Sequence, residues 1–348
     1  MFFYGFKKIP FLWKFYLVQV SISLFIILTY MWIFPGTSTV VVSLKSISDY
    51  FRISETTPRT VISRRTAELH PKNKFPSCII FGVSKGGTRA VQEYLKLHPD
   101  VVAPSKELHF FDNATLQNEK GEDWYLSQLP SSKPSQIVVD KSPDYFQHTQ
   151  SAKLIFKANN KTKLLLLLRD PVERLVSEYM QLVEKNPLLP PFEDWVIDVR
   201  TGQVNTKHPS VMVGAYSQYL AHWLEVFPRN QIHIIESFNL RVNPVTEMNL
   251  TEKFLGLRPF LKAKDFYYNA TRGFYCMRLR ASGVIQCLGK SKGRTHPAVR
   301  EDVMEKLREF YYPYNLELNR LLNMKFPWSR FLHYKRPDHL SENLLPND

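Results

Sequence analysis

The segment from Ile79 to Arg89, IIFGVSKGGTR, limits the possible folds of this chain more than any other feature. It begins as an apolar strand, turns through two glycines and enters the helical pattern TRAVQEYLKLHP. A strand, a glycine turn and a helix N-terminus together present backbone N–H groups and a positive dipole end to an anion. A nucleoside-triphosphate loop has its lysine after the last glycine, whereas Lys85 precedes Gly86 and Gly87 here. The loop therefore predicts an anion site that does not suit a metal-bound triphosphate, and an ordinary glycine turn is the alternative.

Further apolar runs repeat this order of strand and helix along the chain. We predict strands at residues 77–83, in QIVVDKSP, in KTKLLLLLRDP and in QIHIIES. The five leucines suit a strand that is buried on both faces of a parallel sheet. Helices are predicted from Thr88 to about Leu97, over PVERLVSEYMQLV, and over HPAVREDVMEKLREFYYPYNLELNRLL with an interruption near Pro313. The alternation indicates an α/β fold, a parallel sheet flanked by helices.

The N-terminal region predicts a membrane anchor. Residues 15–34, FYLVQVSISLFIILTYMWIF, carry no charge over 20 positions, about the length that crosses a bilayer core. Three lysines precede this run and the next basic residue is Lys45, so the N-terminus is expected in the cytosol. A cleaved signal peptide is the alternative, although its apolar region would be shorter. We predict a cytoplasmic tail at 1–14, a transmembrane signal anchor at 15–34, a lumenal stem at 35–74 and one domain at 75–348.

The charge of the chain indicates an anionic partner. The 348 residues carry a formal net charge of +14 at pH 7, which suits nucleic acid, anionic lipid or an acidic polymer. Nucleic acid is a poor partner for a lumenal protein, so a polysaccharide or a nucleotide is expected. A basic surface that only keeps the protein soluble is the alternative.

Cysteines and sequons fit an oxidising lumenal compartment. Cys276 and Cys287 lie close in sequence and are expected to form a local disulfide. Cys78 lies in an apolar strand and is expected to be a buried free thiol. Three cysteines without CxxC spacing do not form the pattern of a zinc site. Four N-x-[ST] sequons are candidate glycosylation sites: Asn113, Asn160, Asn249 and Asn269.

Two further stretches carry groups that bind anions. Arg169 ends the leucine strand, where open α/β sheets bind ligands, and Ser177 lies in the helix that follows. A guanidinium and a hydroxyl can together hold a terminal phosphate. An ion pair between Arg169 and an acid at the start of that helix is the structural alternative. The loop SKGRTHP, residues 291–297, is either another anion cradle or a solvated basic loop.

The stretch SKELHFFDN brings acid–base groups together. Glu107, His109 and Asp112 lie within six residues. A positioned carboxylate or imidazole can accept a proton during a group transfer. A structural ion pair between Glu107 and a lysine is the alternative.

Six stretches in order resemble the heparan sulfate glucosamine 3-O-sulfotransferases: GVSKGGTRAVQEYLKLHPDV, KELHFFDN, DKSPDYF, LLRDPVERLVSEYMQ, NATRGFYC and KGRTHP. The resemblance runs from about Ser77 to Trp328. It implies the sulfotransferase fold, with a P-loop-like parallel sheet, in a single-pass type II protein of the Golgi membrane. It also implies transfer of a sulfuryl group from 3′-phosphoadenosine 5′-phosphosulfate to the 3-hydroxyl of glucosamine in heparan sulfate, without a metal. The alternatives are transfer to another position of a glycosaminoglycan and a non-catalytic lumenal heparan-binding protein.

The resemblance also implies roles for individual residues. Glu107 would be the general base, with His109 as the alternative. Lys85 would stabilise charge on the oxygen that bridges sulfate and 5′-phosphate, and Lys141 would hold the sulfuryl group or an acceptor anion. The implied donor-binding residues are Lys85, Gly86, Gly87, Thr88, Arg89, Arg169, Ser177, Lys292, Gly293, Arg294, Thr295 and His296. The implied acceptor-binding residues are Glu107, His109, Phe111, Asp112, Lys141, Ser142 and Gln181.

The sequence departs from the family pattern at two positions. Ser84 stands where the family commonly has a basic residue, and Asp144 stands where it commonly has alanine. The lost positive charge and the added negative charge are expected to weaken polyanion binding or to change which sulfated sequence is preferred.

Overall fold

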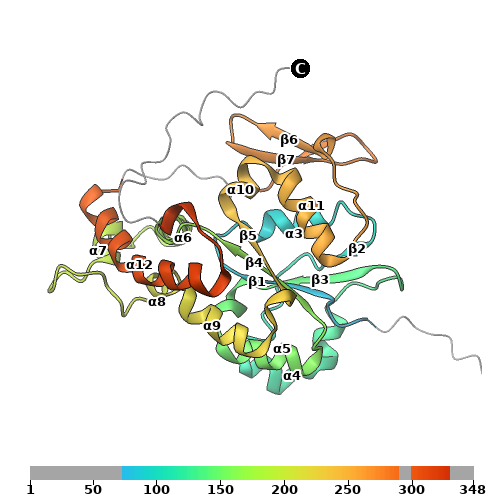
Figure 1. Ribbon diagram of the computed structural model, residues 1–348, viewed down its shortest axis with the longest axis horizontal. Helices are drawn as coiled ribbons and strands as arrows, with labels where there is room; N and C mark the ends of the chain where they lie inside the picture. Colours follow the sequence, from blue (N-terminus) through green and yellow to red (C-terminus); the bar gives the residue numbers. More distant parts are fainter. Residues whose placement is uncertain (1–72, 290–298, 330–348) are drawn as a thin grey trace, which may run out of the picture. The chain divides into compact units, whose positions relative to one another are not determined.

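The computed structural model describes residues 73–289 and 299–329 (Figure 1). The predicted cytoplasmic tail, the signal anchor and nearly all of the stem lie outside these residues, as does the loop SKGRTHP. Among the described residues, the helices are too short or too polar to span a bilayer.

A five-stranded parallel sheet forms the centre of the domain, in the order β2-β3-β1-β4-β5. All four predicted strands are confirmed, and the α/β class with them. The leucines of β4 are fully buried, as expected for a strand with both faces covered. The strands are β1 (Cys78–Gly82), β2 (Val101–Val102), β3 (Ile137–Lys141), β4 (Lys163–Leu168) and β5 (Ile232–Glu236).

Helices cover both faces of this sheet (Figure 1). One face packs against α3 (Thr88–Leu95), α10 (Ser237–Val242) and α11 (Pro244–Leu255). The other packs against α4 (Ala114–Ser127), α5 (Thr149–Ala158) and α9 (Tyr216–Val226). In this second layer the ring of Trp223 lies 4.1 Å from that of Phe81, and both side chains are fully buried. Burying a large apolar side chain of this kind contributes about 1.5–3 kcal/mol.

A third group of helices surrounds the helix that follows β4. They share an apolar core that includes Val172, Leu175, Leu307 and Tyr311. The C-terminal helix α12 runs without a break through Pro313, so the predicted interruption is wrong. Proline removes one backbone hydrogen bond, but buried side chains on both sides of Pro313 hold the two halves in line. The helices of this group are α6 (Pro171–Lys185), α7 (Phe192–Val196), α8 (Pro209–Met212) and α12 (Glu301–Leu322).

A small antiparallel sheet, which the sequence analysis did not predict, lies in the order β6-β7-β8. The predicted disulfide between Cys276 and Cys287 is present, and Cys78 is a buried free thiol, as expected. The three strands of this sheet are β6 (Phe266–Asn269), β7 (Phe274–Arg278) and β8 (Ile285–Gln286).

The described part of the chain also contains short 3₁₀ helices. They are η1 (Pro143–Gln147), η2 (Arg229–Gln231), η3 (Ala263–Asp265) and η4 (Pro327–Ser329).

Candidate active site

The glycine loop connects β1 to α3 at the carboxyl edge of the sheet. A Cβ atom on Gly86 would lie 2.8 Å from the carbonyl oxygen of Leu167, so the loop packs too tightly against β4 for any side chain there. Gly87 has a φ of 97°, in the left-handed region, and precedes the first turn of α3. No described side chain caps this helix start. Such an uncapped helix start has backbone N–H groups that suit an anion, and anion binding by the loop stays a prediction.

Lys85 projects from this loop toward α6. Its Nζ donates a hydrogen bond to Oε1 of Gln181 at 2.7 Å, across 96 positions of sequence. Arg169 Nη1 donates to the carbonyl oxygen of Lys85 at 3.4 Å. The structure therefore brings together three residues that the sequence analysis assigned to donor and acceptor binding.

Arg169 also pairs with an acid of α6. Its Nη2 lies 3.2 Å from Glu173 Oε2, so the ion pair considered as an alternative exists beside the contact with the loop. Ser177 lies one helical turn beyond Glu173 and is half-buried. Asp170 accepts hydrogen bonds from the N–H groups of Val172 and Glu173, which fixes the start of the helix.

The remaining donor-binding predictions divide into two groups. Thr88 is buried at the start of α3. Arg89 pairs with Glu93 at 2.8 Å and donates to the Ser105 carbonyl oxygen at 2.9 Å, so its guanidinium lies toward the segment that precedes Glu107. The other five predicted residues lie outside the described part of the chain: Lys292, Gly293, Arg294, Thr295 and His296.

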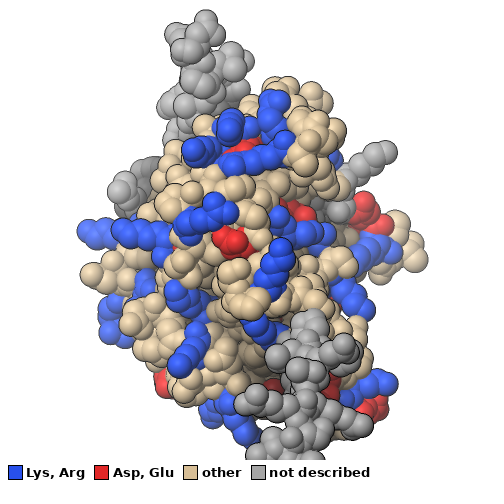
Figure 2. Space-filling view, turned by 90° about the vertical axis from the view of Figure 1, so that its right-hand side faces the viewer, with Lys and Arg blue, Asp and Glu red and all other residues tan. Residues whose placement is uncertain are grey.

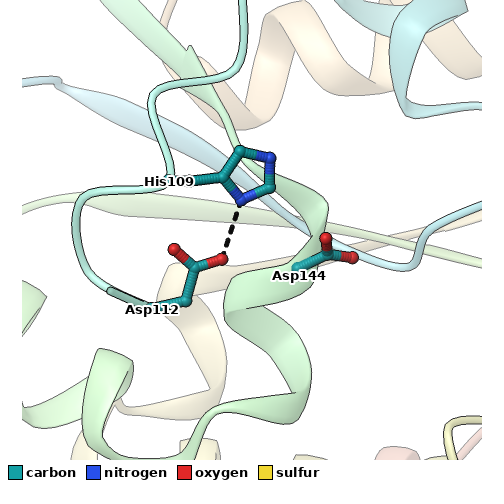
Figure 3. A group of neighbouring side chains, drawn as sticks. All are labelled: His109, Asp112 and Asp144. Atoms are coloured by element: carbon teal, nitrogen blue, oxygen red, sulfur yellow. Dashed lines mark hydrogen bonds and ion pairs between the residues drawn. The ribbon is translucent and has the colours of Figure 1, made fainter. Parts of the chain in front are cut away.

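A chain of charged groups begins at the end of β3. Lys141 is buried, and its Nζ forms an ion pair with Oε1 of Glu107. The other oxygen of Glu107 lies 3.1 Å from Nε2 of His109. Nδ1 of His109 lies 2.9 Å from Oδ2 of Asp112, the contact drawn as a dashed line in Figure 3. The imidazole thus lies between two carboxylates, and the carboxylate of Glu107 lies between two cationic groups.

These contacts determine the protonation of the site. Burial by itself would raise the pKa of Glu107, but the hydrogen bonds from His109 and Lys141 outweigh it and lower the pKa to about 2. The hydrogen bond with Asp112, followed by that with Glu107, raises the pKa of His109 to about 10. At neutral pH, Glu107 is therefore a carboxylate that can accept a proton, whereas His109 is an imidazolium that cannot.

Asp144, from η1, adds a third carboxylate to this group (Figure 3). Ligand atoms of His109, Asp112 and Asp144 lie within 4.8 Å of one another, close enough to share a cation. The Nδ1 atom of His109 is in contact with Oδ2 of Asp112, so these side chains take part in an ion-pair network. Burial, followed by the neighbouring carboxylates, raises the pKa of Asp144, and Glu178 of α6 is among those carboxylates. The acidic cluster therefore faces the helix that contacts Lys85.

Two predicted acceptor-binding residues support this loop from within. Ser142 is fully buried, and its Oγ accepts hydrogen bonds from the N–H groups of Leu108 and His109. Phe111 is 5% exposed, with its ring 5.0 Å from that of Tyr125 in the apolar core. Both side chains lie on the core side of the loop, and their contact with an acceptor stays a prediction.

Two residues that the sequence analysis missed also hold the site. Ser237 Oγ donates to the carbonyl oxygen of Gly86 at 2.6 Å. Asp140 is fully buried, burial raises its pKa to about 6, and its Oδ2 accepts from the hydroxyls of Tyr125 and Tyr145. Both lie at the carboxyl end of a predicted strand, a position that could have identified them.

Three of the four predicted glycosylation sites have exposed asparagines, namely Asn113, Asn160 and Asn249. Asn113 also caps α4 by accepting from the N–H group of Leu116. Asn269 is half-buried and accepts from the N–H group of Arg272. Glycosylation at these positions stays a prediction.

Comparisons with known proteins identify the family of this chain. The family model described as a sulfotransferase domain matches residues 75–320. Heparan sulfate glucosamine 3-O-sulfotransferase 5 of Mus musculus is 42% identical over 271 residues, which cover 76% of this chain and 78% of that protein. Heparan sulfate glucosamine 3-O-sulfotransferase 6 of Homo sapiens is 39% identical over 74% of this chain and 75% of that protein. A solved sulfotransferase from Alicyclobacillus acidocaldarius shares the fold, with a TM-score of 0.57 at 22% identity over 74% of this chain and 100% of that chain. The chain therefore belongs to the sulfotransferase family, among the heparan sulfate glucosamine 3-O-sulfotransferases.

Proposed function

We propose that this protein transfers a sulfuryl group from 3′-phosphoadenosine 5′-phosphosulfate to the 3-hydroxyl of glucosamine residues in heparan sulfate. The observation that carries the proposal is Glu107, which is held ionised between Lys141 and His109 at the edge of the sheet. The names of the relatives support the substrate and the position of transfer.

The glycine loop fits the donor. A Cβ on Gly86 would clash with β4, which indicates a backbone cradle rather than a side-chain site. Lys85 extends from that cradle, and Arg169 is tied to it through the Lys85 carbonyl. When bound, the donor supplies the sulfuryl group. Lys85 offers a positive charge where negative charge develops on its departure, and Arg169 with Ser177 would hold the second phosphate.

Glu107 is the proposed general base. Each of its oxygens already accepts one hydrogen bond, and a carboxylate oxygen has a further lone pair for an acceptor hydroxyl. The low pKa keeps Glu107 ionised at neutral pH, so its benefit comes from position rather than from base strength. The positive charges of Lys141 and His109 then stabilise the site, and Asp112 holds His109 in orientation.

The proposed setting is the Golgi membrane, with the catalytic domain in the lumen. The uncharged run at 15–34 and the basic residues that precede it support this orientation. The Cys276–Cys287 disulfide also suits an oxidising compartment. Sensitivity of the expressed chain to a glycosidase that removes N-linked glycans would test the lumenal assignment.

Transfer of labelled sulfate from the donor to heparan sulfate tests the reaction. Full-length wild type is compared with Glu107→Gln and with Glu119→Gln, an exposed control on α4. We expect label at the glucosamine 3-position and a loss of about 10²–10⁴-fold in rate for Glu107→Gln alone, with donor affinity retained. Label at another position would show that the enzyme modifies a different acceptor group and not the 3-hydroxyl. Heparan binding without transfer to any glycosaminoglycan would favour a non-catalytic binding protein.

A further inference from the structure

Two arginine side chains lie over the ring of Phe260, in the segment between α11 and β6. The guanidinium carbons of Arg258 and Arg280 lie 5.4 and 3.8 Å from the centre of the Phe260 ring. Lys262 and Lys264 follow Phe260 in the chain, and both are exposed. We call Arg258, Lys262, Lys264 and Arg280 the Phe260 cluster.

Acidic side chains, one buried and one partly exposed, pair with the two arginines of the cluster. Arg280 pairs with Asp265, which is 1% exposed, and also donates to the Phe260 carbonyl oxygen at 2.6 Å. Nε of Arg258 donates to Asp100 at 3.0 Å. Nη1 of Arg280 and both terminal nitrogens of Arg258 have no hydrogen-bond partner among the described residues. Because a guanidinium has five N–H donors, each arginine keeps donors for a ligand while its position is already fixed.

The surrounding segment has a large excess of positive charge. Residues 253–280 contain seven lysines and arginines and a single acid, Asp265, so they contribute +6 of the chain's +14. On β6, the side chains of Tyr267 and Tyr268 are 43% and 48% exposed. Figure 2 shows Lys and Arg side chains gathered on the upper part of one face, at the height of β6 and β7 in Figure 1, with few acidic groups among them. Such a surface complements a polymer that carries closely spaced sulfates.

The Phe260 cluster lies at the far end of α3 from the glycine loop. The carbonyl oxygen of Arg258 lies 3.1 Å from Nε2 of His98, just beyond α3, and the Tyr94 hydroxyl near the end of α3 donates to the Tyr275 carbonyl of β7. The eight residues of α3 span about 12 Å at 1.5 Å per residue. A single reacting sugar therefore cannot occupy both places, whereas a chain that extends beyond it can.

We propose that the Phe260 cluster binds a second sulfated stretch of the same polysaccharide whose glucosamine is modified at Glu107. This inference rests on the proposed function. It predicts that the cluster increases affinity for long chains and leaves turnover of short acceptors unchanged, because only a long chain gains a second contact.

The test is Lys262→Glu together with Lys264→Glu in the full-length protein. Both lysines are exposed, and Asp265, the acid that Lys264 influences, keeps its ion pair with Arg280, so the fold should tolerate the change. The control is Lys153→Glu with Lys157→Glu, two exposed lysines of α5 that give the same change in net charge. KM and kcat are measured with a short sulfated oligosaccharide and with full-length heparan sulfate, and binding of both is measured without donor.

We expect the KM and the Kd for full-length heparan sulfate to rise roughly tenfold in the cluster variant only, which is 1.4 kcal/mol of binding free energy. Values for the short oligosaccharide should match those of wild type. Equal effects of the two double variants, or equal effects on short and long chains, would overturn the inference. Loss of binding to vesicles that contain phosphatidylserine, with polysaccharide binding unchanged, would assign the cluster to a membrane surface instead. Absence of transfer by wild type would refute the proposed function, while the binding data would still decide the inference.

Discussion

Replacing Glu107 by glutamine would leave the buried ammonium of Lys141 without its carboxylate partner. The fall in the pKa of Glu107 from 4.5 to about 2 corresponds to roughly 3 kcal/mol of interaction free energy. Because 35% of the Glu107 side chain is exposed, water screens the interaction. We therefore reduce the interaction free energy of Glu107 with its cationic neighbours to about 2 kcal/mol. His109 and Lys141 share this free energy, so we assign about 1 kcal/mol to the pair of Glu107 with Lys141.

A double-mutant cycle measures that pairwise contribution. Urea unfolding is compared for wild type, Glu107→Gln, Lys141→Met and the double variant. We expect each single variant to lose about 2 kcal/mol, because each leaves a desolvated partner, and the double variant to lose about 1 kcal/mol less than their sum. Glu107→Gln should lose transfer activity both alone and in the double variant. The effect of this substitution on catalysis can then be distinguished from its effect on unfolding free energy.

An exposed pair on α12 supplies the matched control. Glu317 and Arg320 form an ion pair in which their side chains are 44% and 72% exposed, so water should screen their coupling almost completely. A Glu107–Lys141 coupling no larger than that of Glu317–Arg320 would refute the reasoning that burial makes this pair strong.

Three further changes test the surroundings of the site. Gly86→Ala places a methyl group 2.8 Å from the Leu167 carbonyl oxygen, so we expect a loss of about 1–3 kcal/mol in unfolding free energy and weaker donor binding by titration; wild-type affinity would contradict the backbone cradle. Asp144→Asn removes a negative charge beside Asp112, so the KM for heparan sulfate should fall roughly threefold, and an unchanged KM would place Asp144 away from the acceptor. The pKa of folded His109 lies above its usual 6.5, so its charge stabilises the fold below pH 6.5 and this contribution is lost as the pH rises toward about 10. The difference in unfolding free energy between wild type and His109→Gln should accordingly be about 1 kcal/mol at pH 6 and shrink as the pH rises through about 10, whereas a difference independent of pH would argue against a protonated imidazole.

The central sheet could be predicted because its strands have strong local signals. The leucine run of β4 is apolar at every position, and only a strand covered on both faces suits it. The sheet of β6, β7 and β8 gave no such signal, since its strands are short and partly exposed. Packing of Phe266 against Tyr94 of α3 joins it to the domain, and the Cys276–Cys287 disulfide links β7 to the end of β8 within the small sheet.

The chemical groups of the candidate site could be named from the amino-acid order alone. The glycine loop, Lys85, Glu107 and Arg169 were identified from local stretches and from their resemblance to a family. These groups stand within short motifs, where residue type and spacing are visible without a fold.

Tertiary structure decided how those groups interact. Glu107 and Lys141 are 34 positions apart, and they meet because Lys141 ends a strand next to the loop that carries Glu107. Their contact, together with that of His109, makes Glu107 the ionised group and His109 the protonated one. Tertiary packing also buries Phe111 and Ser142 on the core side of the loop. Burial and charge pairing depend on distances in space, which residue order alone does not specify.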